Sequence, residues 1–558
     1  MKTNSIAHML TYHVGRVGNK CAYKYYSPRS TNAVSLSYRE LYDSALSIGN
    51  IISFNNFRGK YALLMYPPGL DFIEAFFGCM FGNMLAIPMY IPPSNEPDSR
   101  LSSIISNVDI EVVFTVSSTL EQVTQQVKKL FNNKRYTIIC TDKLESINTA
   151  HMSINIDLDI PPLIQFTSGS TSAPKGVIVG HDNLIANLRM IEHGFCKHTQ
   201  LSGGETSVSW LPFFHDMGLI WGILYPIYTG GSSILMSPND FLHHPYKWLQ
   251  LISMYQASIS GAPNFAYDYC VTRIREEKIE GLDLSSWKVA FNGSEMIRPT
   301  TIQRFIERFQ NYKFDKKSFF FCYGMAETTL YVSGETGVIG DVDSSVSVGQ
   351  IDEQAELVIV DENYQPLPDC HRGEIWVRGP HVARGYVDNP EATKDIFGAK
   401  IINDTSGKEY LRTGDLGYLT QGKLHVTGRM KNMIIVNGKN YYGEEIEYFV
   451  VRKKDYFVET GACVTRINEG RDDSEIVFIQ EIKKQRLNEV SNELIELEEL
   501  AIELSRKILH EFKLSVNRFI FLGTTRLPRT SSGKIDRARV HEVVNDKSHE
   551  YLLNVHTI

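Results

Sequence analysis

The sequence predicts an α/β protein with a large N-terminal domain and a smaller, mobile α+β C-terminal domain. Strand-like apolar runs alternate with helical patterns over residues 1 to about 333, which is typical of two doubly wound α/β layers. Short strands separated by turn residues replace this alternation over about 345–429, which indicates a small β-rich subdomain. We therefore place the N-terminal domain at 1–429 and the C-terminal domain at 430–558.

The elements of the N-terminal layers follow in order. The first half has predicted helices from Tyr38 and over Leu70–Phe81, and predicted strands over Tyr61–Met65, Leu85–Pro88 and Glu111–Val116. After an apolar strand at 163–166, the pattern resumes with strands at 207–212, 230–236 and 288–292 and a helix over 245–255.

The later elements have a different texture. Short strands are predicted over Ala355–Val360, Gly373–Val377 and Lys423–Val426, followed by a strand near 433–438. A charged helical pattern covers Leu487–Phe512, and the tail from Gly523 is polar and basic. The pattern of predicted elements changes at 428–432, which predicts a hinge near Lys431.

Composition excludes several classes of function. The net charge of −7 provides no basic surplus for binding a nucleic acid. The eight cysteines are scattered singly, without a CxxC pair, and the first residues lack a secretory apolar core, so a cytoplasmic location is expected. The most apolar stretch, 76–93, is interrupted by Asn83 and Pro88, which favours buried core and no membrane span.

The segment LIQFTSGSTSAPKG (163–176) predicts a phosphate-binding loop. A short apolar strand leads into the small and hydroxyl residues Thr167, Ser168, Gly169, Ser170 and Thr171, which allow backbone N–H groups to surround an anion. Lys175 adds a positive charge at the rim. The spacing does not match a Walker loop, which needs Gly-Lys-Ser/Thr, and a flexible linker is the remaining alternative.

Two further segments end predicted strands. The histidine in WLPFFHDMGL, His215, lies beside aromatic residues, where a packing or capping histidine is the more common outcome. The segment FNGSE places Gly293, Ser294 and Glu295 after a strand, where ligands bind in doubly wound sheets, although an ordinary turn has the same composition.

The segment YGMAETT (323–329) predicts nucleotide and metal contacts. Tyr323 can stack on a purine, Gly324 permits close approach, and Thr328 can donate to a phosphate. The Glu327 carboxylate can hold Mg²⁺, which needs only one such ligand when it bridges phosphates. A helix cap with a solvated glutamate is the alternative.

Two segments nearer the C-terminus complete the pattern. In YLRTGDLG a turn presents Asp415, whose two oxygens can accept both hydroxyls of a ribose, and Arg429 in GRMKN follows at a distance from which it can reach the same sugar or a phosphate. In PRTSSGKIDR, Lys534 lies on a Gly/Ser loop that can bring a positive charge to a carboxylate and an α-phosphate. Ser531 and Lys534 also match the S-x-x-K pattern of serine acyl-enzymes, but in a polar tail.

In this order, the motifs resemble those of the acyl-adenylate-forming superfamily, and WLPFFHDMGLI, APNFAYDYC, LDLSSW and YGMAETTLYVSG resemble fatty acyl-AMP ligases in particular. The resemblance implies that ATP and a fatty acid form acyl-AMP and pyrophosphate, with Mg²⁺ present. It also implies that His215 positions the carboxylate and that residues 291–295 lie against the adenine. The acyl group would then pass to the phosphopantetheine thiol of an acyl carrier protein.

Some features depart from the family pattern or leave alternatives open. Ser172 and Gly443 replace the common glycine and proline, and any insertion between Leu330 and Val346 is short, which bears on how restrained the C-terminal domain is. A fatty acyl-CoA synthetase, a Ser-Lys amidohydrolase and a silent nucleotide sensor are the rival classes. No basic cluster for free CoA is evident, whereas Arg506, Lys507 and Lys513 are available for an acidic carrier protein.

Overall fold

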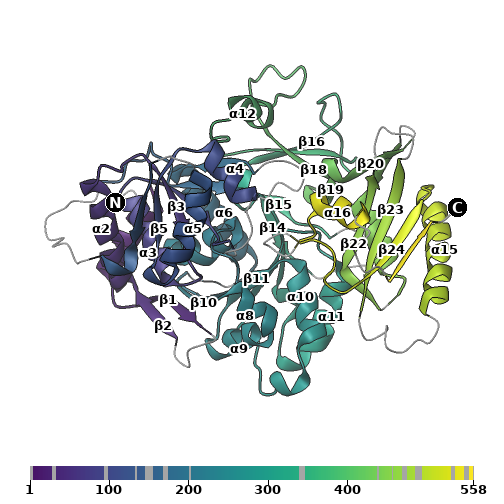
Figure 1. Cartoon of the computed structure of the whole chain (residues 1–558), viewed down its shortest axis with the longest axis horizontal. Coiled ribbons are helices and arrows are strands. Elements are labelled where there is room, and N and C mark those ends of the chain that lie inside the picture. The colour runs from purple at the N-terminus through teal and green to yellow at the C-terminus, as the bar shows by residue number, and fades with distance from the viewer. Residues whose placement is uncertain are drawn as a thin grey trace.

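The structure is a computed structural model of the chain, and five β-sheets form within its described part (Figure 1). The described residues are 4–27, 33–92, 99–131, 135–144, 155–167, 174–199, 201, 203–337, 346–436, 439–454, 456–467, 474–483, 493–529, 534–545 and 552–556.

The first α/β layer contains a six-stranded sheet. Its spatial order is β6 (Thr137–Cys140), β5 (Ile110–Thr115), β3 (Tyr61–Met65), β4 (Leu85–Met89), β7 (Leu163–Phe166) and β8 (Gly176–Val179). The strands run parallel except β8, which turns back against β7. The helices of this part are α1 (Ile6–Val17), α2 (Tyr38–Phe54), α3 (Leu70–Phe81), α4 (Ser99–Asn107) and α5 (Leu120–Phe131).

The second layer contains a nine-stranded sheet. Its spatial order is β15 (Gln350–Ile351), β14 (Ser333–Thr336), β13 (Phe319–Tyr323), β12 (Val289–Asn292), β11 (Ile259–Ala262), β9 (Thr206–Ser209), β10 (Ser232–Met236), β1 (Cys21–Tyr26) and β2 (Val34–Ser37). Strands β13 to β1 are parallel, and the antiparallel β14, β15 and β2 lie at the two edges. The helices are α6 (His181–His198), α7 (Tyr225–Thr229), α8 (Pro238–His243), α9 (Tyr246–Met254), α10 (Asn264–Arg273) and α11 (Pro299–Phe309).

Local sequence explains why these elements form. Helix α2 begins at a capping box in which Ser37 and Glu40 satisfy each other's backbone groups, and Leu41 and Ile48 lie on its buried face. Strands β3, β7, β11 and β12 are buried along nearly their whole length, as expected where helices cover both faces of a sheet. One large hydrophobic core connects both layers.

The β-rich subdomain is a four-stranded antiparallel sheet with one short helix. It consists of β16 (Glu356–Val360), β17 (Gly373–Arg378), β18 (Leu411–Thr420), β19 (Lys423–Arg429) and α12 (Pro390–Phe397).

We call the described residues from Met433 to His556 the C-terminal unit. It has a two-stranded sheet, β20 (Met433–Val436) and β21 (Lys439–Tyr442), and a four-stranded sheet, β22 (Phe457–Ile467), β23 (Glu475–Ile482), β24 (Arg518–Gly523) and β25 (Leu553–His556). Its helices are α13 (Gly443–Val451), α15 (Glu493–Phe512) and α16 (Val540–Asn545). Two hydrophobic clusters of its own lie on the two faces of the larger sheet, and Figure 1 shows the unit at one end of the molecule, beside α10 and α11.

The predicted fold class is confirmed, with differences in individual elements. Strand β3 and helix α3 have the predicted bounds, and β4, β5 and β12 differ by one residue at one or both ends. Strand β8 was missed because Gly176–Val179 is only four residues long and directly follows the loop. Asp415 was expected on a turn, but it lies within the ten-residue strand β18, because the glycines beside it are accommodated at an irregularity in the ladder. Among the described residues, no helix has the length and apolar character needed to span a membrane.

Candidate active site

The two ends of the predicted phosphate loop are held together by the β7–β8 hairpin. Thr167 follows β7, and its N–H donates to the carbonyl of Lys175 over 3.0 Å. The ammonium of Lys175 lies 4.8 Å from the ring centroid of Tyr386. Ser168, Gly169, Ser170 and Thr171 lie outside the described residues. The structure therefore places the base of the loop, and the conformation of its tip stays a prediction.

His215 lies on the turn between β9 and a π-helical segment, Met217–Leu224. Its Nδ1 is 2.5 Å from Oδ1 of Asp216, and Gln165 on β7 donates to the neighbouring Phe214 carbonyl over 2.9 Å. Burial alone would raise the pKa of Asp216, but His215, the Met217 N–H and Lys534 together lower it. The turn therefore accepts a hydrogen bond from β7 and interacts electrostatically with Lys534 of the C-terminal unit.

The Glu327 carboxylate is buried, and the side chain of Tyr386 holds one of its oxygens. The hydroxyl of Tyr386 donates to its Oε1 over 2.9 Å. Burial raises the pKa of Glu327, whereas the Tyr386 hydroxyl and the Arg429 cation act in the opposite direction. No group of three or more His, Cys, Asp or Glu side chains arranged for a metal ion was found within the described part of the chain. A site for a metal that keeps waters and phosphate ligands needs only one carboxylate, which is what Glu327 offers.

The segment after β12 is conformationally strained. Ser294 has a φ of +71°, which side chains other than glycine rarely adopt. A Cβ at Gly293 would lie 2.7 Å from the sulfur of Cys322, so this position requires glycine for packing. Glu295 accepts from the N–H of Phe265 over 2.6 Å, and burial raises its pKa while Lys534 is among the groups that oppose this. Close packing and this hydrogen bond thus fix the position of the segment beyond the end of its strand.

Asp415 connects two candidate nucleotide contacts. The Tyr323 hydroxyl donates to its Oδ2 over 2.7 Å, and Nε of Arg429 lies 3.0 Å from its Oδ1. Asp415 and Arg429 are direct partners in the β18–β19 ladder, which explains why the spacing of the two motifs brings them together. Each carboxylate oxygen retains capacity for a second donor, so ribose hydroxyls can still bind.

Two residues of the YGMAETT segment serve the protein's own packing. A Cβ at Gly324 would lie 1.7 Å from the Leu330 carbonyl oxygen, so the close approach at this glycine is to the protein's backbone. The Thr328 hydroxyl is fully buried and donates to the Met325 carbonyl over 2.9 Å. In this arrangement the Thr328 hydroxyl donates within the protein, and its contact with a phosphate stays a prediction.

Lys534 reaches the N-terminal layers from the C-terminal unit. Burial is the main cause that lowers its pKa, and Arg429 adds to the effect, while Glu295, Asp216 and Asp415 oppose it. These groups lie just after β12, on β18 and β19, and on the His215 turn, so the lysine lies where the predicted motifs meet. Thr530–Gly533, which precede it, lie outside the described residues.

A cavity of about 990 Å³ contains this meeting point. Its lining includes the predicted residues Ser294, Glu295, Tyr323, Gly324, Asp415, Arg429 and Lys534. Thr167, Lys175, His215, Glu327 and Thr328 do not belong to that lining, although Glu327 and Asp216 interact electrostatically. The volume suits a nucleotide-sized ligand.

Three groups near the site were missed from the sequence. Tyr386 contacts both Glu327 and Lys175, Arg298 lines the cavity, and Lys431 does so as well. Burial, with Arg429 next in importance, lowers the pKa of Lys431 to about 8. Lys431 was predicted as a hinge only. The role of Tyr386 has no local signal in the sequence, because Glu327 is 59 residues away and Lys175 lies in a different layer of the fold.

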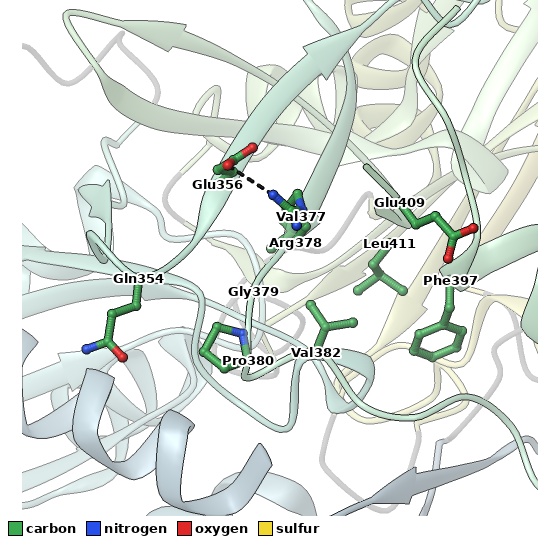
Figure 2. Close-up of a pocket in the computed structure, with 10 residues that line it drawn as sticks. All are labelled: Gln354, Glu356, Val377, Arg378, Gly379, Pro380, Val382, Phe397, Glu409 and Leu411. Carbon is green, nitrogen blue, oxygen red and sulfur yellow. Dashed lines mark hydrogen bonds and ion pairs between the residues drawn. The ribbon is translucent and has the colours of Figure 1, made fainter. Parts of the chain in front are cut away.

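A second cavity, of about 380 Å³, lies in the β-rich subdomain among β16, β17, β18 and α12 (Figure 2). Glu356 at its edge accepts from Arg378 over 3.1 Å and from Lys408 over 3.0 Å. Glu356 and Arg378 of its lining thus contact each other, and none of the predicted site residues lines it.

Residues 10–387 match the family model described as AMP-binding enzyme. The chain belongs to the AMP-binding enzyme family. The match covers both α/β layers and the predicted phosphate loop, so the resemblance inferred from the motifs is confirmed.

Three known proteins of this family show the same relationship. The chain is 35% identical over 71% of its length to medium-chain-fatty-acid–[acyl-carrier-protein] ligase TtuA of Teredinibacter turnerae, covering 66% of that protein. It is 32% identical over 96% of its length to the ligase of the same description, JamA, of Moorena producens, covering 94% of it. A fatty acyl-adenylate ligase from L. pneumophila, solved with acyl adenylate and pyrophosphate, is 32% identical with a TM-score of 0.73, and the match covers 100% of this chain and 98% of that chain.

Proposed function

We propose that this enzyme activates a fatty acid with ATP to acyl-AMP and pyrophosphate, and then transfers the acyl group to the phosphopantetheine thiol of an acyl carrier protein. The observation that carries the proposal is the position of Lys534, which enters the same cavity as Tyr323, Asp415 and Glu295. The near-complete match to medium-chain acyl-carrier-protein ligases supports a fatty acid and a carrier protein as substrates.

The site suits a reaction between two anions. In the first step, a carboxylate oxygen bonds to the α-phosphorus of ATP, and the bond from that phosphorus to the bridging oxygen breaks to release pyrophosphate. Lys534, Lys175 and Arg429 provide positive charge where negative charge accumulates. In the second step, the thiol sulfur bonds to the acyl carbon, AMP leaves and the thiol proton passes to solvent.

The predicted residues divide between the ligands. Thr167, Ser168, Gly169, Ser170, Thr171 and Lys175 would surround the phosphates, and His215 would position the fatty acid carboxylate. Tyr323, Gly293, Ser294 and Glu295 would face the adenine, and Asp415 with Arg429 would hold the ribose. Pre-formed contacts of Asp415 reduce the ordering that nucleotide binding requires.

Glu327 would hold Mg²⁺ through a carboxylate that Tyr386 already orients. A bound Mg²⁺ would neutralise phosphate charge. Tyr386 donates to Oε1 only, so Oε2 can accept a ligand without loss of that hydrogen bond.

Domain division and location are part of the same proposal. Residues 1–429 would form the N-terminal domain, and residues 430–558 would move as the C-terminal domain about a hinge near Lys431. All eight cysteines are described and free of disulfides, which is compatible with a reducing cytoplasm. Arg506 and Lys507 are exposed on α15, as carrier docking would require.

The test has two stages that use the purified full chain. ATP–pyrophosphate exchange with fatty acids of graded length should be fatty-acid-dependent, and its absence would contradict the adenylation step. The enzyme is then given fatty acid, MgATP and either free CoA or a holo-carrier protein, and thioester formation is measured. Efficient acyl-CoA formation without carrier acylation would make the protein a fatty acyl-CoA synthetase.

A further inference from the structure

A glutamate of the C-terminal unit is inserted among donors of the N-terminal layers. Glu459 lies near the start of β22, and its Oε1 is 3.0 Å from Nη1 of Arg304 on α11. The hydroxyl of Thr301, also on α11, donates to Oε2 over 2.8 Å, and Arg298 donates to the Glu459 backbone carbonyl. The Glu459 side chain retains 14% of its exposure, so the contact is largely removed from water.

The N-terminal side of this contact does not depend on Glu459. The same Nη1 of Arg304 lies 2.9 Å from Oδ1 of Asp268 on α10. When Glu459 leaves, Arg304 therefore keeps a carboxylate partner, and Glu459 becomes hydrated. The separation therefore leaves neither Arg304 nor Glu459 as an uncompensated buried charge, and such a charge is the usual large cost of breaking a buried ion pair. The contact is thus suited to repeated formation and release.

A short series of contacts connects Glu459 to the loop that carries Lys534. The carbonyl of the next residue, Thr460, accepts from Nη2 of Arg529 over 3.1 Å. Arg529 forms a backbone bridge with Ile535, which directly follows Lys534. The base of the lysine loop is therefore attached to the strand segment that Glu459 fixes against α11.

We propose that Glu459 is a positioning residue for acyl-AMP formation, which holds the C-terminal unit so that Lys534 reaches the cavity and which releases when the unit moves for acyl transfer. The inference rests on the proposed adenylation and on the proposed movement of residues 430–558. Burial and the Glu459 carboxylate raise the pKa of Asp268, and Arg304, Lys483 and Arg298 oppose this. The guanidinium of Arg304 thus contacts two carboxylates, that of Asp268 from the N-terminal layers and that of Glu459 from the C-terminal unit.

The experiment separates the two half-reactions in the full chain. Glu459→Ala is compared with Glu542→Ala, which removes an exposed glutamate that pairs with Arg539 on the same unit. ATP–pyrophosphate exchange reports the arrangement shown here, and transfer from purified acyl-AMP to a holo-carrier protein reports the other step. We expect Glu459→Ala to reduce exchange at least tenfold and to change transfer less than twofold, with Glu542→Ala unchanged in both.

A second variant tests the hydrogen-bond donor on α11 that contacts Glu459. Thr301→Val keeps the shape of a fully buried side chain and removes the donor to Glu459. We expect it to reduce exchange by about threefold, a smaller loss than in Glu459→Ala, because Arg304 still holds the Glu459 carboxylate. Because both variants remove the same contact, the double variant should be no slower than Glu459→Ala alone. If the losses of exchange activity in the two single variants added up in the double variant, Thr301 and Glu459 would act separately, and the shared contact would not explain the effect of Glu459→Ala.

The outcomes distinguish this inference from the function on which it rests. Absence of exchange in the unaltered enzyme would contradict adenylation itself. Normal exchange in the unaltered enzyme, with equal losses in both half-reactions of Glu459→Ala or with none, would overturn the role of Glu459. Thermal unfolding of each variant is followed as well. A lowered midpoint together with loss of both half-reactions would mean that Glu459 only maintains the fold, which would also overturn it.

Discussion

The N-terminal layers and the C-terminal unit hold their site residues by different means. Glu295, Tyr323 and the residues of the β7–β8 hairpin follow buried strands of large sheets, so apolar packing determines where they lie. Lys534 follows a loop whose base is fixed by charged groups. Arg529 pairs with Glu481 over 3.1 Å, and Arg537 pairs with Glu447 over 2.7 Å.

Two acids of the C-terminal unit differ in the same way from one acid of the first layer. In the C-terminal unit, Glu481 and Glu447 are almost inaccessible and each has a guanidinium partner. In the first layer, Glu74 on α3 is surrounded by Ser44 and by the acidic Asp71 and Glu40, and burial is the main cause that raises its pKa to about 7. Buried ion pairs are a costly way to hold a structure but a specific one. The lysine loop is therefore specified by individual charges, and the N-terminal site residues are specified by a continuous core.

The largest effect is expected from removal of the lysine that crosses between the two regions. Lys534→Ala should slow ATP–pyrophosphate exchange by about a hundredfold or more, because loss of one donor to a developing charge costs on the order of 3–4 kcal/mol of barrier. The folded state should be preserved, because the lysine follows a loop at the edge of a cavity. Lys507→Ala, on the exposed face of α15, is the matched control and should leave exchange unchanged. Near-normal exchange in Lys534→Ala would remove this residue from the mechanism.

Removal of a buried anion in the C-terminal unit should destabilise that unit. Glu481 accepts from the Leu527 N–H over 2.7 Å and from Arg529, so Glu481→Ala leaves both donors without this partner. A loss of about 3 kcal/mol is expected, at the lower end of the range for a broken buried pair, since Arg529 keeps 25% exposure. Urea unfolding measures it, with Glu542→Ala as the exposed control. A change below about 0.5 kcal/mol would mean that core packing alone holds the loop.

The N-terminal site was largely predictable because its signals are local. An apolar run followed by small residues identifies a strand and the turn after it, and parallel strands bring such turns to one edge. Asp415 and Arg429 were predicted to act together from spacing, and the β18–β19 ladder pairs them directly. The strand β8 was hidden because Gly176–Val179 is short and follows a lysine and a proline.

The contacts that fix the C-terminal unit could not be predicted in this way. Arg304 and Glu459 are 155 residues apart, and nothing in the composition of either segment indicates the other. Tyr386 is equally hidden, since an aromatic residue in an ordinary loop has no pattern that points to Glu327. Long-range polar pairs depend on the final arrangement of elements, so periodicity does not reveal them.

The acid of the first layer, Glu74, predicts a pH dependence of stability. The pKa of Glu74 is raised to about 7, so the folded state binds a proton that the unfolded state has lost. This contribution is fully present below the unfolded pKa, near 4.5, and is lost as pH rises to about 7 and above. Glu74→Gln should therefore increase the free energy of unfolding at pH 8 by about 3 kcal/mol relative to its effect at pH 4.5. Urea titrations at both pH values measure it, and an equal effect at both would contradict the raised pKa.

The smallest effect is expected where a pre-formed contact only orients a nucleotide ligand. Tyr323→Phe removes the hydroxyl that donates to Asp415 over 2.7 Å, while Arg429 continues to hold the other oxygen. One hydrogen bond to a charged group contributes about 1.5–3 kcal/mol, and the remaining partner keeps the loss near the lower value, so the KM for ATP should rise about tenfold. The kcat of pyrophosphate exchange should change little, because the ring still packs at the end of β13. Tyr364→Phe, on the exposed surface of the β-rich subdomain, is the control. A fall in kcat at unchanged KM would mean that Tyr323 acts on the reacting groups. The N-terminal site would then contribute more to the reaction than a pre-packed surface that orients the nucleotide for Lys534.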